Sequence, residues 1–128
     1  MADKILIVDD DPAICKLLEK VMHSNELETT TVNCGMDALS ILKNHTFDLI
    51  LMDIQMPNMD GYRATEMIRG LSDKEKATIP IIAMTANAFE EDRKKALAKG
   101  MNGHIAKPVD AEKVEKTICS VLGSQSEQ

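Results

Sequence analysis

Short apolar runs alternate along this chain with longer segments in which apolar residues recur at helical spacing. Unbroken apolar runs cover residues 5–8, 49–52 and 79–84, and a weaker run covers residues 103–106. Such runs are typical of strands that are buried on both faces, as in a parallel sheet. Residues 28–32 form a fifth candidate strand, which is polar and rich in threonine and therefore suits a sheet edge.

The segments between these strands show the period of amphipathic helices. Asp11 followed by Pro12 predicts a helix start, and apolar residues then recur at positions 14, 17, 18, 21 and 22. Four further helices are predicted over residues 36–44, 62–69, 89–99 and 111–122, the third of these ending before Gly100. Strands and helices that alternate in this way form right-handed crossovers. The sequence therefore predicts an α/β fold with a parallel sheet of five strands and five helices on both faces.

Composition limits the classes of protein to which the chain can belong. With 128 residues, 44% hydrophobic and 28% charged, it has the mix of a soluble globular domain. We expect one domain over residues 1–128, with residues 123–128 as a frayed tail. No apolar run approaches the roughly 20 residues of a membrane span, and no signal peptide is visible, so we expect a cytoplasmic protein that does not contact the membrane. The net charge of −6 argues against binding to nucleic acid.

The three cysteines do not form a recognisable framework. Cys15, Cys34 and Cys119 are odd in number and widely spaced, with no CxxC pair and no histidine in the spacing of a zinc site. We expect reduced thiols, two on helices and one in a loop.

Polar residues follow the predicted strands at their carboxyl ends. Asp9 and Asp10 follow the first strand, Asp53 ends the third, Thr85 follows the fourth and Lys107 follows the fifth. In open α/β sheets the ligand crevice lies outside these ends, and the flavodoxin-like strand order 2-1-3-4-5 places strands 1 and 3 side by side there. The sequence therefore predicts that these side chains meet in one pocket.

A pocket of this composition suits phosphoryl transfer. Two carboxylates ~4 Å apart repel each other by about 4 kcal/mol at an effective dielectric near 20, so a cation must compensate. Mg²⁺ fits because it binds one or two carboxylates and keeps positions open for water and phosphoryl oxygens. Lys107 adds a second positive charge and Thr85 a hydroxyl donor. Together with a nucleophilic carboxylate, these groups position and neutralise a phosphoryl group.

Four motifs then resemble a known family, the receiver domains of two-component response regulators. They are ILIVDDD at residues 5–11, LMDIQMP at 51–57 with Asp60 and Gly61 after it, MTA at 84–86 and AKP at 106–108. Their order and spacing match over nearly the whole chain. The resemblance leaves open a stand-alone, a chemotaxis-type or a hybrid-kinase-type receiver, and the first methionine and short tail favour a separate chain.

The resemblance implies a signalling switch in a phosphorelay and not an enzyme that acts on other substrates. Such a domain takes a phosphoryl group from a phosphohistidine on a histidine kinase or phosphotransfer protein, and it slowly dephosphorylates itself. Its partner downstream is another protein, and the domain is a monomer or a weak phosphorylation-dependent dimer. Docking is expected on the face made by the fourth and fifth predicted helices, 89–99 and 111–122, and the fifth strand.

By the same resemblance, Asp53 is the phosphoacceptor and Mg²⁺ is the cofactor. Asp10 and Asp53 are expected to bind the ion directly, Asp9 through a water molecule, and Gln55 through its backbone carbonyl.

Thr85 and Lys107 are expected to contact the phosphoryl group, with a cis peptide bond between Lys107 and Pro108. His104 stands where many family members have a Tyr or Phe ring that turns inward with the threonine. Because imidazole is smaller and titrates near neutral pH, a muted or pH-sensitive switch is expected, and an ordinary surface histidine is the alternative. By the same resemblance, Asn87 and Gln55 lie at positions that flank the phosphoryl group and tune its hydrolysis.

Two other functions use related chemistry. An aspartyl-nucleophile phosphohydrolase of the dehalogenase type needs an acidic residue two positions after the nucleophile, where this chain has Gln55, and a cap segment that it lacks. A flavin or dinucleotide carrier needs a glycine-rich phosphate loop or stacking aromatic rings. The first strand is followed by aspartates, and the chain has three aromatic residues. The sequence therefore disfavours both functions.

Overall fold

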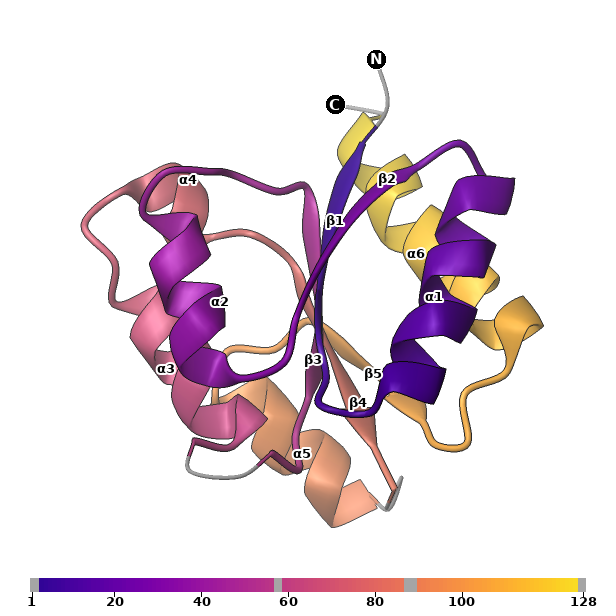
Figure 1. The fold of residues 1–128 in the computed structure, drawn as a ribbon. Coiled ribbons are helices and arrows are strands. Elements are labelled where there is room, and N and C mark those ends of the chain that lie inside the picture. Colours follow the sequence, from indigo (N-terminus) through magenta and orange to yellow (C-terminus); the bar gives the residue numbers. More distant parts are fainter. Residues whose placement is uncertain (1–2, 57–58, 87–89, 127–128) are drawn as a thin grey trace.

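A computed structural model describes residues 3–56, 59–86 and 90–126 and shows a parallel sheet between two layers of helices (Figure 1). The strand order is β2-β1-β3-β4-β5, which confirms the predicted fold class and order. The bounds of the strands are β1 Lys4–Val8, β2 Glu28–Val32, β3 Leu49–Asp53, β4 Ile81–Thr85 and β5 Gly103–Ala106. Each strand lies within two residues of its predicted position.

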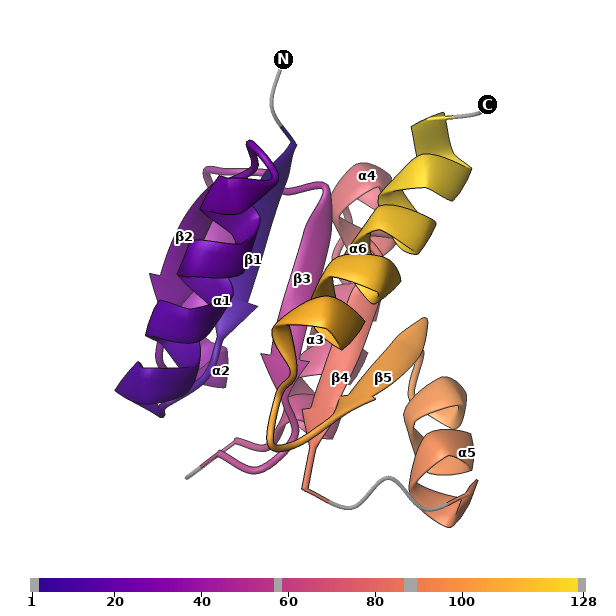
Figure 2. The same ribbon diagram turned by 90° about the vertical axis from the view of Figure 1, so that its right-hand side faces the viewer.

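Helices α2 and α3 lie on one face of the sheet, and α1 and α6 lie on the other (Figure 1). Helix α5 lies beside the edge strand β5 (Figure 2). The bounds of the helices are α1 Pro12–Ser24, α2 Gly35–Leu42, α3 Gly61–Arg69, α4 Lys74–Ala77, α5 Glu90–Ala98 and α6 Ala111–Ser126. None of the helices in the described part of the chain is long and apolar enough to cross a membrane.

The described residues contain six helices, one more than predicted. The additional helix, α4, is a single turn of charged residues, too short to show a hydrophobic period. Its N-cap is Asp73, whose side chain accepts a hydrogen bond of 3.0 Å from the Glu75 N–H.

The last helix is longer than predicted. Helix α6 runs through Gly123 to Ser126, where the sequence analysis expects a frayed tail. A glycine lowers helix propensity by about 1 kcal/mol but still donates its backbone hydrogen bond, so it does not have to end a helix. The expected first residue of the helix over 89–99, Phe89, lies outside the described residues.

The three central strands are buried on both faces, which explains their unbroken apolar runs. Alternate residues of β1 and β3 contribute to two separate apolar clusters, one under α2 and α3 and the other under α1 and α6. Every residue of β3 and β4 is buried. Strand β2 is exposed or half-buried throughout and, among the described strands, pairs with β1 alone, as its polar sequence predicts.

Candidate functional site

The candidate site lies where the strands end, toward the lower end of the sheet in Figure 1. Strand register places Val8 beside Met52, Asp53 beside Met84, and Thr85 beside Ala106. Residues that end these strands or follow them directly are therefore neighbours in space. As predicted, the strand ends carry Asp9, Asp10, Asp53, Thr85 and Lys107.

Backbone hydrogen bonds continue the sheet into the site and fix the first residues after the strands. The Asp9 N–H donates to the Val32 carbonyl at 3.1 Å, and the Lys107 N–H donates to the Thr85 carbonyl at 2.7 Å. The side chains of the site therefore start from a backbone that the sheet itself holds. The Lys107–Pro108 peptide bond is cis, which confirms the prediction.

The centre of the site is an ammonium group between two buried carboxylates. Lys107 Nζ lies 3.1 Å from Asp53 Oδ1 and 3.3 Å from Asp9 Oδ2. Asp53 is 2% exposed and Asp9 is 1% exposed, so both carboxylates have lost most of their hydration. An uncompensated charge would be costly at this depth, and the shared ion pair offsets part of that cost.

Short turns after two strands fix the orientation of the carboxylates. The Asp11 N–H donates to Asp9 Oδ1 at 2.9 Å, and the Gln55 N–H donates to Asp53 Oδ1 at 3.1 Å. Each aspartate thus accepts a bond from the backbone two residues later, which is the geometry of an Asx turn. Asp11 also begins α1, because its side chain accepts from the Ala13 N–H at 2.9 Å.

The pKa values of Asp53 and Lys107 depend on two opposing effects, burial of the charged groups and the ion pair between them. Burial is the main cause that raises the pKa of Asp53, and the Asp9 charge adds to it, while Lys107 and the Gln55 N–H act in the opposite direction. Burial alone would lower the pKa of Lys107, but the Asp53 and Asp9 carboxylates outweigh it and raise that pKa. Lys107 is therefore a permanent cation, and Asp53 is a more basic carboxylate than an exposed aspartate.

The acidic residues of the site fit a divalent cation. Asp9, Asp10 and Asp53 each offer a carboxylate oxygen, and these oxygens lie within 4.8 Å of one another. Asp9 Oδ2 is buried, and among the described residues its one polar contact is the ion pair with Lys107. Asp10 is exposed, so the cluster is open to solvent on one side. Hard oxygen ligands around an unsatisfied buried carboxylate suit Mg²⁺, which also keeps several waters.

The remaining predicted residues lie around this centre. Thr85 ends β4 and is 6% exposed, while Gln55 has an exposed side chain. His104 is half-buried on β5 and lines a hollow with Arg93 and other residues of α5. Asn87 lies outside the described residues.

Sequence reasoning missed the part that Gly61 plays in the site. The Gly61 N–H donates to the Ile54 carbonyl at 3.0 Å, so α3 begins directly against the end of β3. A Cβ at position 61 would lie 2.9 Å from Ile54 Cα and closer still to the carbonyl oxygen of Asp53. Only glycine fits there without movement of the segment that carries Asp53. The Asp60 and Gly61 pair in the sequence is the signal that could have indicated this close approach.

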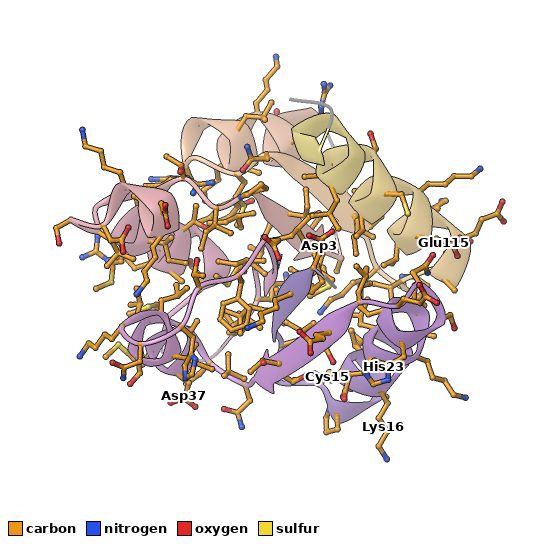
Figure 3. The ribbon with its side chains drawn as sticks, turned by 90° about the horizontal axis from the view of Figure 1, so that it is seen from above. Asp3, Cys15, Lys16, His23, Asp37 and Glu115 are labelled. Atoms are coloured by element: carbon orange, nitrogen blue, oxygen red, sulfur yellow. The ribbon has the colours of Figure 1, made fainter. Side chains whose placement is uncertain are left out.

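Cys15 lies on a helix, as two of the three cysteines were expected to, but its contact with the site was not predicted. Its thiol donates to the Asp9 carbonyl at 3.4 Å. Burial and, second, the Asp9 charge raise its pKa to about 11, so the thiol stays protonated at neutral pH. The neighbouring Lys16 extends outward from α1 (Figure 3). Cys15 therefore supports the site as a small buried side chain and not as a reactive group.

Comparisons of sequence agree with this geometry. A family model described as the response regulator receiver domain matches residues 5–119. The chain is 40% identical over 114 residues to the sensor histidine kinase RcsC of Escherichia coli strain K12, a match that covers 89% of the chain and 12% of RcsC. It is 33% identical over 123 residues to the sensor protein GacS of Pseudomonas syringae pv. syringae, covering 95% of the chain and 14% of GacS. The chain thus spans a small part of the length of these curated relatives.

Solved structures show the same fold. The chemotaxis response regulator CheY4 of Vibrio cholerae superposes with a TM-score of 0.88 at 27% identity, covering 94% of this chain and 99% of CheY4. The receiver domain of the sensor histidine kinase PA1611 from Pseudomonas aeruginosa PAO1 superposes with a TM-score of 0.85 at 34% identity, covering 96% of this chain and 99% of the PA1611 domain. In that structure a magnesium ion is coordinated in the active site cleft.

Proposed function

The chain belongs to the response regulator receiver domain family, and on this premise we propose that Asp53 is its phosphoacceptor. The observation that carries the proposal is the shared ion pair, in which Lys107 Nζ lies within 3.3 Å of both Asp53 and Asp9 at the end of the sheet. Asp53 is the acidic residue that ends the central strand, with Lys107 on one side and Asp10 in the same cluster. A receiver domain is a signalling switch, so the reaction at Asp53 is its own modification.

The donor in this proposal is a phosphohistidine on a histidine kinase or a phosphotransfer protein. A carboxylate oxygen of Asp53 attacks the phosphorus and a P–O bond forms. The P–N bond of the donor breaks, and the imidazole nitrogen leaves with the bonding electron pair and is protonated by solvent. Since Lys107 and the Gln55 N–H both contact Oδ1 of Asp53, we expect Oδ2 to be the attacking oxygen. Lys107 and the Thr85 hydroxyl then bind oxygens of the transferred phosphoryl group.

Mg²⁺ is the cofactor in this proposal. Asp10 and Asp53 would hold it directly, Asp9 through a water molecule and Gln55 through its backbone carbonyl. The unsatisfied buried oxygen of Asp9 and the open side at Asp10 support this assignment, as does the magnesium ion in the PA1611 receiver domain. When bound, the ion neutralises charge on the phosphoryl oxygens and on the clustered carboxylates.

Transfer from a histidine-phosphorylated phosphotransfer domain tests the assignment of Asp53. The wild-type chain should take up one phosphoryl group in the presence of Mg²⁺, and Asp53→Asn should take up none. Asp48→Asn is the matched control, because Asp48 precedes the same strand at its opposite end, where its side chain accepts from the Lys4 N–H at 2.7 Å. Transfer to Asp53→Asn at the wild-type rate would rule the assignment out.

We also propose that the phosphorylated state ends by slow self-dephosphorylation. Water attacks the phosphorus, the P–O bond to Asp53 breaks, and inorganic phosphate leaves while the carboxylate is restored. Time courses of the isolated phosphorylated chain should show first-order loss of label, and complete stability over many hours would contradict this step.

The output of the switch is proposed to be a change in binding to a separate protein or to a second copy of the chain. The Thr85 hydroxyl is drawn toward the phosphoryl group, and His104 turns inward from the hollow that it lines with Arg93, Ala96 and Leu97. Phosphorylation shifts the equilibrium between the two conformations of the chain, because the contact of Thr85 with the phosphoryl group exists only in the phosphorylated state.

Amide chemical shifts with and without beryllofluoride, a phosphoryl mimic, test this output. Perturbations should reach α5, β5 and α6 from the loops around Asp53. Perturbations confined to the loops around Asp10, Asp53 and Lys107 would contradict the proposed switch.

A further inference from the structure

Helix α5 has little apolar attachment to the rest of the molecule. Among its side chains that the structure describes, only Ala96 is buried, while Leu97 is 50% exposed and the others are exposed as well. A single methyl group removes little apolar area from water. Helix α3 differs, since five of its nine residues are buried. Apolar packing therefore fixes α3 on the sheet but contributes little to the position of α5.

Polar contacts with α3 attach α5 to the rest of the molecule, where apolar packing is sparse. Positions 62, 66 and 69 of α3 lie on one stripe of the helix, at spacings of four and three. The side chain at each of these positions contacts one residue of α5 or of the turn that follows α5. The contacts are Lys95 Nζ 4.7 Å from the centroid of the Tyr62 ring, Lys99 Nζ 3.3 Å from Glu66 Oε2, and Arg69 Nε donating to the Gly100 carbonyl at 2.9 Å. All three contacts join a cation to an acceptor or an aromatic ring.

The three contacts differ in strength along the stripe. The Arg69 guanidinium is half-buried and also donates to the carbonyls of Ala77 and Ile79 and to Asn102 Oδ1. Gly100 has a φ of +104°, and a Cβ there would lie 3.0 Å from Arg69 Cγ, so a glycine makes room for the arginine. The Arg69 end of the stripe is therefore rigid.

The two lysine contacts are at the surface and are weaker. Lys99 and Glu66 have side chains that are 36% and 42% exposed, and Lys95 is exposed as well. Exposed contacts of this kind are screened by salt, so each changes the equilibrium between attached and detached α5 only by a small factor. They lie nearer than Arg69 to Gly61, where α3 begins against the end of β3.

We propose that this polar stripe, and not apolar packing, positions α5, which pivots about the Arg69 anchor when the two lysine contacts open. Because the Gly61 N–H is bonded to the Ile54 carbonyl next to Asp53, a shift at Asp53 reaches α5 through α3, in addition to any path through Thr85. Only this last step rests on the proposed function. The pivot itself is a property of the unphosphorylated chain.

Hydrogen exchange of α5 amides in the unphosphorylated full chain tests the pivot. Lys95→Met and Lys99→Met keep the length of the side chain but remove the cation. Each should speed exchange in α5 by about 2- to 5-fold, the factor that exposed cation contacts contribute, with α1 and α6 unchanged. Lys94→Met is the matched control, because it removes the same charge from the next exposed position of the same helix and should leave α5 exchange within error.

The effect of salt provides an independent readout. Raising the salt concentration from ~0.05 M to ~1 M should speed α5 exchange in the wild type and have less effect in Lys99→Met. The pivot is overturned if Lys95→Met and Lys99→Met behave like Lys94→Met, or if they speed exchange in every helix equally.

Beryllofluoride separates the pivot from the proposed function. If the pivot transmits the signal, beryllofluoride should shift α5 amide resonances less in Lys95→Met than in the wild type, because one of the contacts that join α3 to α5 is already lost. Equal shifts in both proteins would overturn the path through α3. Failure of beryllofluoride to bind either protein would contradict phosphorylation of Asp53 and leave the exchange result standing.

Discussion

Replacement of Gly61 by alanine tests how closely α3 and the segment that carries Asp53 depend on each other. The new Cβ would lie 2.9 Å from Ile54 Cα and 3.0 Å from the carbonyl carbon of Asp53. These are backbone atoms, so no side chain can turn away to relieve the contact. Either α3 moves outward or the end of β3 shifts, and the hydrogen bond from the Gly61 N–H to the Ile54 carbonyl is strained in both cases.

The size of the effect follows from two opposing contributions. Overpacking of this kind costs about 1–3 kcal/mol. Alanine gains about 0.4–1 kcal/mol over glycine because the unfolded chain has fewer conformations to lose. We therefore expect Gly61→Ala to lower the free energy of unfolding by a net ~1 kcal/mol. Its Mg²⁺ affinity should also fall, because the displaced segment carries Asp53.

Gly70→Ala is the control for this substitution. Gly70 lies at the other end of α3 with a φ of −88°, and a Cβ there would meet its nearest atoms, the Glu66 and Met67 carbonyl oxygens, at an ordinary 3.6 Å. Urea denaturation followed by circular dichroism measures both variants, with Gly70→Ala expected to be as stable as the wild type or slightly more stable. If Gly61→Ala proves equally stable, the close approach of α3 to Asp53 does not exist as described.

Three further predictions concern the site and the cysteines. Millimolar Mg²⁺ should raise the melting temperature of the wild type. At a free Mg²⁺ concentration of one hundred times Kd, the gain in the free energy of unfolding is about 2.7 kcal/mol. An equal rise in the melting temperature of Asp10→Ala would show that the ion binds elsewhere. Lys107→Met leaves two buried carboxylates without their cation and removes the charge that holds the pKa of Asp53 down, so the pKa of Asp53 rises further. Denaturation at different pH values should therefore show a loss of about 1–3 kcal/mol at pH 7 and a smaller loss at pH 4, whereas a loss independent of pH would contradict the ion pair. Iodoacetamide at pH 7 should alkylate exposed Cys119 long before Cys15, whose thiol is buried with a pKa raised to about 11. Mass spectrometry of the peptides measures the order, and alkylation of Cys15 before Cys119 would contradict this prediction.

The strands and the main site could be predicted from the sequence because both follow from strong local signals. Buried parallel strands appear as unbroken apolar runs, and β3 and β4 are buried at every position. The polar residues that follow these runs must gather at one end of a parallel sheet, so the sequence alone predicts that Asp53 and Lys107 lie together. Helix α1 could also be predicted, because Asp11, Pro12 and the apolar period give both its start and its inner face.

Other features depend on distances that the sequence does not encode locally. Helix α4 is one turn of charged residues and has no period to recognise. Arg69 resembles a surface residue at the end of a helix, yet it bonds to backbone carbonyls 8 to 31 residues away. Gly61 is constrained by backbone atoms of another segment. Each of these features arises from packing between elements, which the pattern of residues along one element does not reveal.

Phosphorylation by acetyl phosphate tests the central claim most directly, because it requires no partner protein. The chain incubated with acetyl phosphate and Mg²⁺ should gain one phosphoryl group that is stable in acid and labile in base, as an acyl phosphate is. Proteolysis at acidic pH and mass spectrometry should place this group on the peptide that contains Asp53, and Asp53→Asn should remain unmodified. A phosphoryl group on any other residue of the wild type, or undiminished modification of Asp53→Asn, would contradict the account.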